Sequence, residues 1–102
     1  MSTTSYNLEG KYALVTGGTH GIGLAISEKL GSYGCKIAIM ARSLENLEET
    51  SEQFRKKNIE HLYFQADALS EEDCNYVMDE IESSWGRLDI LINNVGGGGR
   101  WG

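Results

Sequence analysis

The stretch that decides the fold is TGGTHGIG at residues 16–23, which follows an apolar run at residues 12–15 and precedes a helix-like pattern. We interpret it as a turn that joins a buried strand to a helix and binds phosphate. Glycine adopts a positive φ without steric cost, so Gly17 can make the sharp turn. Gly21 and Gly23 lack a Cβ, which lets a pyrophosphate approach the backbone at one and a strand pack against the other. The free N–H groups and the dipole of the helix start favour an anion there.

A glycine-rich turn alone is a weak signal of function. The spacing here is G-x-x-x-G-x-G, and no lysine follows Gly21 or Gly23, which argues against a triphosphate-binding loop. Two later signals add to it, namely Asp67 after an apolar run and the sequence NNVG at residues 93–96. Occurring in this order, the three signals resemble the short-chain dehydrogenase/reductase family, and the resemblance covers the chain from about Leu8 onward.

Four short apolar segments alternate with three amphipathic helical patterns. The apolar segments are residues 12–16, 37–41, 62–66 and 90–93. This alternation predicts an α/β fold in which a doubly wound parallel sheet is built by right-handed crossovers. The family resemblance implies an incomplete Rossmann-type sheet of strand order 3-2-1-4, with the cofactor across the carboxyl ends of the strands. We expect residues 1–102 to be a single dinucleotide-binding domain, the amino-terminal part of a longer enzyme.

Helical periodicity predicts which side chains of each helix face the sheet. Gly31 and Gly34 are expected to end the first helix and Asn58 the second, and Ser70 with Asp73 resembles a capping box at the start of the third. The predicted inward-facing residues are Ile22, Ile26 and Leu30 in the first helix, Leu44, Leu47, Ser51 and Phe54 in the second, and Cys74, Val77, Met78, Ile81 and Trp85 in the third.

The composition argues against several classes of function. The chain of 102 residues carries a net charge of -6, whereas a nucleic-acid-binding surface needs clustered Lys and Arg. No apolar run approaches the roughly 20 residues that span a bilayer. Residues 1–7 lack the features of a secretory signal, so we expect a cytoplasmic protein. Cys35, Cys74, His20 and His61 show no metal-ligand spacing, and we expect no metal site.

The residue that follows the second predicted strand indicates the cofactor. An acidic residue is expected near this position for NAD, whereas this chain has Arg42, followed by Ser43. A guanidinium grips a 2′-phosphate through charged hydrogen bonds, so we predict NADP, and Glu45 nearby keeps NAD as the less favoured cofactor. His20 occupies a place where NADP-preferring members of the family often carry a basic residue. The alternative for Arg42 is a solvated side chain at a helix start.

The family resemblance implies further cofactor contacts. Asp67 would accept a hydrogen bond from the adenine amino group, and its alternative role is to cap the turn before the third helix. Asn93 and Asn94 are expected to be buried amides that need hydrogen-bond partners, Asn93 for structure and Asn94 near the cofactor ribose. The predicted cofactor-binding residues are Gly17, Gly18, Thr19, His20, Gly21, Ile22, Gly23, Arg42, Ser43, Asp67, Ala68, Asn94 and Gly96.

No catalytic residue can be assigned in this chain. Members of the family use a Tyr-x-x-x-Lys pair and a Ser, and none of the five tyrosines here has a lysine four positions later. The resemblance therefore implies an oxidoreductase that transfers hydride between a nicotinamide cofactor and a small-molecule carbonyl or alcohol, with its catalytic residues beyond this chain. The alternative is a truncated or regulatory module that binds NADP without catalysis.

The fourth predicted strand bears on assembly. Under the strand order 3-2-1-4 it lies at the side of the sheet, and residues 89–94 contain no Pro or Lys to block further pairing. We therefore expect this chain to self-associate through these residues, and a full-length relative to be a homo-oligomer. We expect neither a nucleic acid nor a membrane as partner.

Overall fold

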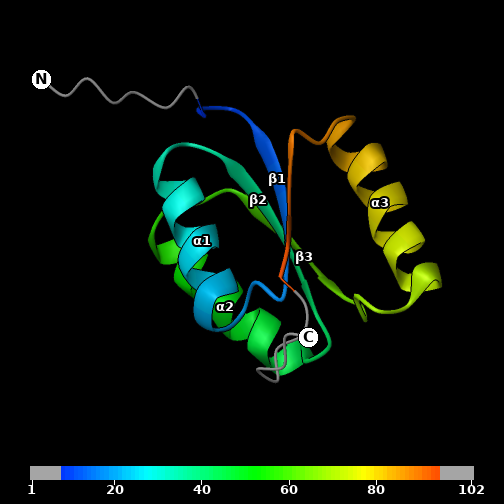
Figure 1. Ribbon diagram of the computed structural model, residues 1–102. Helices are drawn as coiled ribbons and strands as arrows, with labels where there is room; N and C mark the ends of the chain where they lie inside the picture. Colours follow the sequence, from blue (N-terminus) through cyan, green and yellow to red (C-terminus); the bar gives the residue numbers. More distant parts are fainter. Residues whose placement is uncertain (1–7, 95–102) are drawn as a thin grey trace, which may run out of the picture.

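The computed structural model describes residues 8–94, in which strands and helices alternate as predicted (Figure 1). Each of the four apolar segments forms a strand whose bounds differ from the predicted ones by at most one residue. The elements in chain order are β1 (Tyr12–Thr16), α1 (Gly21–Ser32), β2 (Lys36–Ala41), α2 (Leu44–Lys56), β3 (His61–Gln65), α3 (Glu71–Trp85) and β4 (Ile90–Asn93).

The four strands form one parallel sheet in the order β3-β2-β1-β4, which confirms the predicted order. Val15 in the middle of β1 lies opposite Ile39 of β2 on one side and Ile92 of β4 on the other. Because the strands are parallel, their carboxyl ends meet at one end of the sheet, at the bottom of Figure 1, and α1 begins there. We call this the carboxyl end of the sheet.

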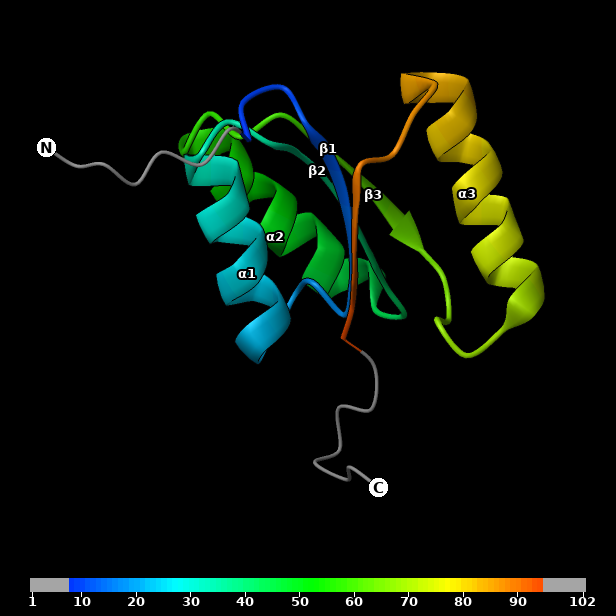
Figure 2. The same ribbon diagram turned by 45° about the horizontal axis from the view of Figure 1, so that its top comes forward.

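Helices cover both faces of the sheet, as Figure 2 shows, with α1 and α2 on one face and α3 on the other. Successive residues of a strand point to opposite faces. Val15 and Ile39 accordingly pack in the cluster under α1 and α2, while Leu14 and Met40 pack in the cluster under α3. Burial on both faces explains why these strands are apolar without alternation.

The packing of α1 differs from the prediction. Its buried residues are Gly23 and Ser27, whereas Ile22, predicted to face the sheet, is 71% exposed. Leu24 and Leu30 are partly buried against the core. The helix approaches the sheet through residues with small side chains, and the pattern of large apolar residues therefore predicts Leu30 correctly and Ile22 wrongly.

The inner faces of α2 and α3 are closer to prediction. Leu44 and Met78 were expected to face the sheet but are 43% and 41% exposed, because each lies at the border of its helix's buried face. The buried residues on these helices are Leu47, Thr50, Ser51 and Phe54 in α2, and Val77 and Ile81 in α3.

The helix ends follow the predicted signals in part. Gly31 lies inside α1 rather than ending it, and Asn58 adopts φ +59 just beyond α2, as expected for a helix stop. Ser70 caps α3 by accepting a hydrogen bond from the Asp73 N–H at 3.1 Å. The reciprocal half of the capping box is absent, because the Asp73 carboxylate accepts from the backbone N–H of Asp67 at 2.8 Å instead.

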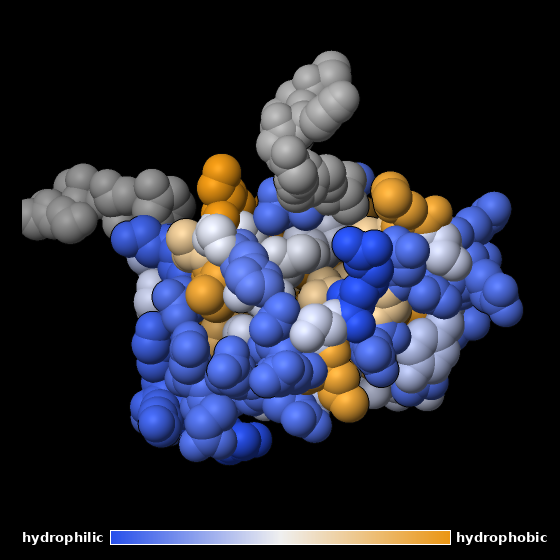
Figure 3. Space-filling view, turned by 90° about the horizontal axis from the view of Figure 1, so that it is seen from below, coloured by the Kyte–Doolittle hydropathy of each residue, from blue (hydrophilic) through white to orange (hydrophobic). Residues whose placement is uncertain are grey.

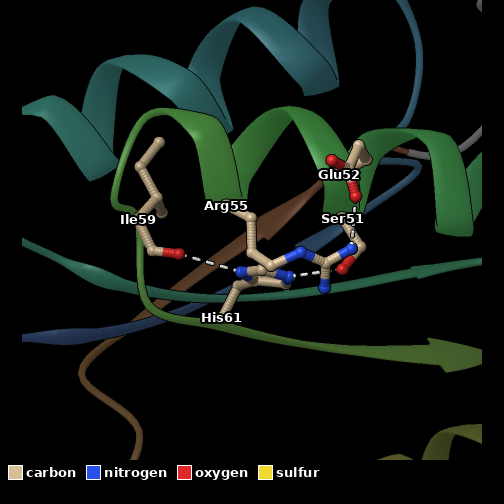
Figure 4. A network of polar contacts seen from close by, with 5 residues as sticks. All are labelled: Ser51, Glu52, Arg55, Ile59 and His61. Carbon is tan, nitrogen blue, oxygen red and sulfur yellow. Dashed lines mark hydrogen bonds and ion pairs between the residues drawn. The ribbon is translucent and has the colours of Figure 1, made fainter.

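A polar network fastens the start of β3 to α2 (Figure 4). His61 Nδ1 lies 2.8 Å from the carbonyl oxygen of Ile59, and its Nε2 lies 2.6 Å from Ser51 Oγ. A carbonyl only accepts, so Nδ1 carries a proton and donates to Ile59, and Nε2 forms the second hydrogen bond with the Ser51 hydroxyl. Arg55 and Glu52 form an exposed ion pair at 2.6 Å on the same helix.

Candidate functional site

The glycine-rich turn joins β1 to α1 at the carboxyl end of the sheet. Gly17 and Gly21 have φ values of +66° and +51°, which glycine adopts without strain. The N–H of Gly17 donates to the carbonyl oxygen of Met40 at 2.9 Å, so the turn starts tied to β2. A Cβ added at Gly21 would have nothing within 4 Å, and the backbone there is open to a ligand.

Two other glycines of the turn are required by packing. A Cβ at Gly23 would overlap the carbonyl oxygen of Gly17 and lie 2.7 Å from Nδ2 of Asn94. A Cβ at Gly18 would lie 2.6 Å from Cγ2 of Ile39. The absence of a side chain at Gly23 lets the start of α1 lie directly against Gly17 and Asn94, and its absence at Gly18 lets the turn lie against Ile39 of β2.

The start of α1 differs from the starts of the other two helices. Ser43 and Ser70 cap α2 and α3 through their side chains, and both helices carry acidic residues in the first turn. The N-cap of α1 is His20, whose side chain makes no capping hydrogen bond, and the first turn of α1 has no acidic residue. The first N–H groups of a helix have no partner within it, so this start offers donors and positive dipole to an anion.

Thr19 and His20 form the outer part of the turn. Thr19 is buried, and its Oγ1 lies 3.0 Å from Nδ1 of the exposed His20. This contact orients the imidazole, whose Nε2 has no hydrogen-bond partner within residues 8–94. Ile22, also predicted as a site residue, is exposed on the first turn of α1.

Arg42 follows the last residue of β2 and is exposed. Within residues 8–94 its guanidinium has neither a hydrogen-bond partner nor an ion-pair partner. Its backbone carbonyl accepts a hydrogen bond from Nε2 of Gln65 at 3.1 Å. The hydroxyl of Ser43 accepts from the N–H of Asn46 at 3.1 Å, which makes Ser43 the cap of α2.

Asp67 follows the end of β3 and adopts the turn-capping role that was its alternative. Its Oδ1 accepts from the N–H of Leu69 at 2.9 Å. Its Oδ2 has no hydrogen-bond partner in the described part of the chain, so the carboxylate retains an acceptor for a ligand. The carbonyl oxygen of Ala68 accepts from the thiol of Cys74 at 3.4 Å.

Thr16 links the end of β1 to the end of β4. Its Oγ1 accepts from the N–H of Asn94 at 2.7 Å and donates to Oδ1 of Asn93 at 3.2 Å. The prediction that Asn93 is buried is wrong, since Asn93 shares a face of β4 with Leu91 and both are exposed. Sequence reasoning missed Thr16 as a site residue, although a polar residue that ends a buried strand was a signal for it.

The structure brings part of the predicted site together. Asn94 contacts the glycine turn, while Arg42 and Asp67 follow the neighbouring strands at the same end of the sheet. Figure 3 looks onto this end from below and shows separate apolar patches among hydrophilic surface. Gly96 lies outside the described residues.

In residues 8–94, no three His, Cys, Asp or Glu side chains are grouped so as to hold a metal ion. Nor does that range include a helix with the length and apolar character needed to cross a membrane. Cys35 and Cys74 are free cysteines. A pocket of about 180 Å³ lies between α3 and the sheet, lined in part by Leu14, Thr16 and Met78, and none of the glycines of the turn lines it.

Comparison with protein families and curated proteins gives consistent matches. The family described as short chain dehydrogenase matches residues 11–101. The 2-dehydro-3-deoxy-D-gluconate 5-dehydrogenase of Formosa agariphila is 33% identical over 97 residues, which cover 94% of this chain and 37% of that protein. The chain therefore spans little more than a third of the length of this relative.

Two solved structures show the same arrangement of elements. L-sorbose reductase from Gluconobacter frateurii, complexed with NADPH and L-sorbose, has a TM-score of 0.90 and 33% identity, over 97% of this chain and 38% of that chain. A xylitol dehydrogenase bound to NAD+ has a TM-score of 0.84 and 34% identity, over 89% of this chain and 35% of that chain.

Proposed function

This chain belongs to the short chain dehydrogenase family, and we propose from that premise that it is the cofactor-binding part of an NADP-preferring oxidoreductase. The proposed reaction is hydride transfer between a nicotinamide dinucleotide and a small-molecule carbonyl or alcohol. The observation that carries the proposal is the start of α1, which lies uncapped at a glycine turn beside the end of β4. The proposed enzyme is cytoplasmic and homo-oligomeric, with this chain as its amino-terminal part.

The diphosphate of the dinucleotide is assigned to the start of α1. Gly21 leaves open space beside the backbone, and the first N–H groups of the helix supply donors without competition from an acidic side chain. Gly17, Gly18 and Gly23 hold this start close to the sheet, and Thr19 and Ile22 flank it. The residues present therefore fit a diphosphate group at this place.

The preference for NADP rests on Arg42 and His20. A 2′-phosphate on the adenosine ribose would meet the guanidinium of Arg42, which has no partner within the described residues and which forms bidentate hydrogen bonds with phosphate. His20 adds a donor from the turn. The similar solved structures include one with NADPH and one with NAD+, so the proposed preference rests on these two side chains alone.

The remaining predicted residues are assigned to the adenosine and to the second ribose. The free Oδ2 of Asp67 is an acceptor for the adenine amino group, with the backbone of Ala68 beside it. Asn94, together with Gly96, would lie near the ribose of the nicotinamide, since Asn94 contacts the turn at Gly23. Ser43 keeps α2 capped behind Arg42.

Catalysis in this proposal divides between the cofactor and residues beyond this chain. The nicotinamide ring supplies or accepts the hydride when the cofactor is bound. The 102 residues bind and orient the cofactor, and they contain no Tyr-x-x-x-Lys pair to move the proton. The second candidate function is a module that binds NADP without catalysis.

Calorimetric titration with NADP and NAD tests the proposed cofactor. We expect NADP to bind more tightly, and Arg42→Ala to reduce the preference roughly tenfold or more, because losing a charged hydrogen bond costs about 1.5–3 kcal/mol. Lys56→Ala is the control, since it removes the same charge from the far end of α2. Equal affinities in the wild type would refute the NADP preference, and no binding of either dinucleotide would refute the cofactor site.

A steady-state assay separates the two candidate functions. The 102-residue chain alone is expected to oxidise no NADPH in the presence of aldehydes or ketones. A longer product of the same reading frame that contains Tyr-x-x-x-Lys should turn over, whereas a reading frame without that pair supports the binding module. Carbonyl-dependent oxidation of NADPH by the purified 102-residue chain would overturn the assignment of the proton donor to residues beyond it.

A further inference from the structure

The side chain of Gln65, the last residue of β3, contacts the backbone of the connection that follows the neighbouring strand β2. Its Nε2 donates to the backbone carbonyl oxygen of Arg42 at 3.1 Å. Gln65 is exposed, and in the sheet it lies opposite Ala41, the last residue of β2. The contact therefore joins the end of β3 to the connection between β2 and α2.

This connection is held on both sides of Arg42. Before it, the carbonyl oxygen of Ala41 accepts from the N–H of Ala66 at 2.9 Å, which continues the pairing of the strands. After it, Ser43 caps α2 through its hydroxyl. The peptide unit between Arg42 and Ser43 lies between these anchors, and its carbonyl is the group that Gln65 holds.

Because Gln65 holds that carbonyl oxygen, it also fixes the backbone position from which the side chain of Arg42 extends. The orientation of the carbonyl determines ψ of Arg42, and the strand pairing of Ala41 constrains the backbone before it. The guanidinium itself has no partner within residues 8–94, so the backbone is what sets the region that the side chain can reach. A phosphate contact by a flexible side chain is stronger when less conformational freedom has to be lost on binding.

We propose that Gln65 is a positioning residue for cofactor selectivity, which acts through Arg42 on recognition of the 2′ position of the adenosine ribose. This inference rests on the proposed function, because it requires that Arg42 contact a 2′-phosphate. Gln65 touches no part of the ligand in this role. Its amide holds the peptide from which the recognising side chain extends.

Adenosine 2′,5′-bisphosphate and adenosine 5′-monophosphate are the probes, because they differ only in the 2′-phosphate. Titration of the 102-residue chain with each gives a selectivity ratio of dissociation constants. Gln65→Met keeps a side chain of similar length and removes the donor, and Gln65→Ala serves as a second variant without the donor. Gln53→Met is the matched control, since Gln53 is an exposed glutamine of α2 whose side chain has no hydrogen-bond partner within residues 8–94.

Both donor-less variants should lower the selectivity ratio about three- to tenfold, in line with the loss of one hydrogen bond. Their affinity for the monophosphate should stay within about twofold of the wild type, and Gln53→Met should leave the ratio unchanged. In an Arg42→Ala background, Gln65→Met should have no further effect on the ratio, because Gln65 acts through the Arg42 side chain and that background lacks it.

Three results would overturn the inference while the proposed function stands. The first is a wild-type ratio that both Gln65 variants retain. The second is an equal fall in affinity for both probes, which would indicate general loosening of the site. The third is an undiminished effect of Gln65→Met in the Arg42→Ala background, which would place Gln65 against the ligand itself. A wild-type chain without preference for the bisphosphate overturns both this inference and the NADP preference.

Discussion

Gly23 lies so close to the backbone of Gly17 that a Cβ at position 23 would overlap the Gly17 carbonyl oxygen. Gly23→Ala should therefore destabilise the protein towards the upper end of the roughly 1–3 kcal/mol that overpacking costs. Gly21→Ala is the control from the same turn, because a Cβ there meets nothing within 4 Å and only the positive φ costs about 1 kcal/mol. Urea unfolding measures both. A Gly23→Ala variant as stable as the wild type would contradict this packing.

Ser51→Ala tests the network between α2 and β3. The change removes the hydroxyl that lies 2.6 Å from Nε2 of His61, and a partly buried polar group left without its partner costs about 1–3 kcal/mol of unfolding free energy. Ser84→Ala in α3 is the control, since the substitution makes the same change in helix propensity at an exposed serine and removes no hydrogen bond. Denaturant unfolding of both variants checks the difference. Equal effects of the two substitutions would mean that the contact contributes nothing to stability.

The hydrogen bonds of the Asp89 carboxylate make the stability of the fold depend on pH. The hydrogen bond from Arg87, together with the backbone N–H of Tyr12, lowers the pKa of the Asp89 carboxyl in the folded state. A lowered pKa stabilises the fold above the unfolded value of about 3.9, and that contribution is lost as the pH falls through the folded pKa.

The difference in melting temperature between wild type and Asp89→Asn should therefore be constant from pH 7 to about pH 5 and shrink below about pH 4. Asp79→Asn, which alters an exposed carboxylate of α3 without a hydrogen-bond partner in the described residues, is the control. A wild-type advantage over Asp89→Asn that persists unchanged at pH 2 would contradict the lowered pKa.

Within residues 8–94, β4 pairs with β1 on one side only. Its other side presents backbone N–H and C=O groups, and Leu91 on this strand is 57% exposed, so another chain can pair there. We predict concentration-dependent growth in light scattering that Leu91→Lys suppresses. Leu69→Lys is the control, because Leu69 is 82% exposed and lies in the connection before α3 rather than in a strand. A stable monomer at high concentration, with slowly exchanging β4 amides, would show that this side of the strand is covered.

The order and type of the elements were predictable because buried parallel strands leave short apolar runs between helical patterns. The inner face of α1 was not, because Gly23 and Ser27 make its closest approach while Ile22 points to solvent. Periodicity counts large apolar side chains and gives no weight to the small ones that allow close approach. Leu44 shows the same weakness at the edge of a helix face.

The candidate site was predictable where it depends on topology alone. Arg42 and Asp67 lie at the same end of the sheet because each follows a parallel strand. The contact of Gln65 with Arg42 depends on the register between β2 and β3, which the sequence does not reveal. The two hydrogen bonds of the Thr16 hydroxyl, to Asn93 and to Asn94, likewise depend on the register between β1 and β4.

At the uncapped start of α1, a substitution that stabilises the helix would weaken the proposed binding of a dinucleotide. A side-chain cap adds about 1 kcal/mol to a helix, and His20→Asp would provide one together with a negative charge at the positive end of the helix dipole. The same carboxylate would repel a diphosphate bound at this start as proposed, so melting temperature should rise while dinucleotide affinity falls. In the wild type the ligand itself would complete the helix, and the melting temperature should climb with dinucleotide concentration. Engineering this protein for thermal stability alone would therefore select against the proposed dinucleotide site.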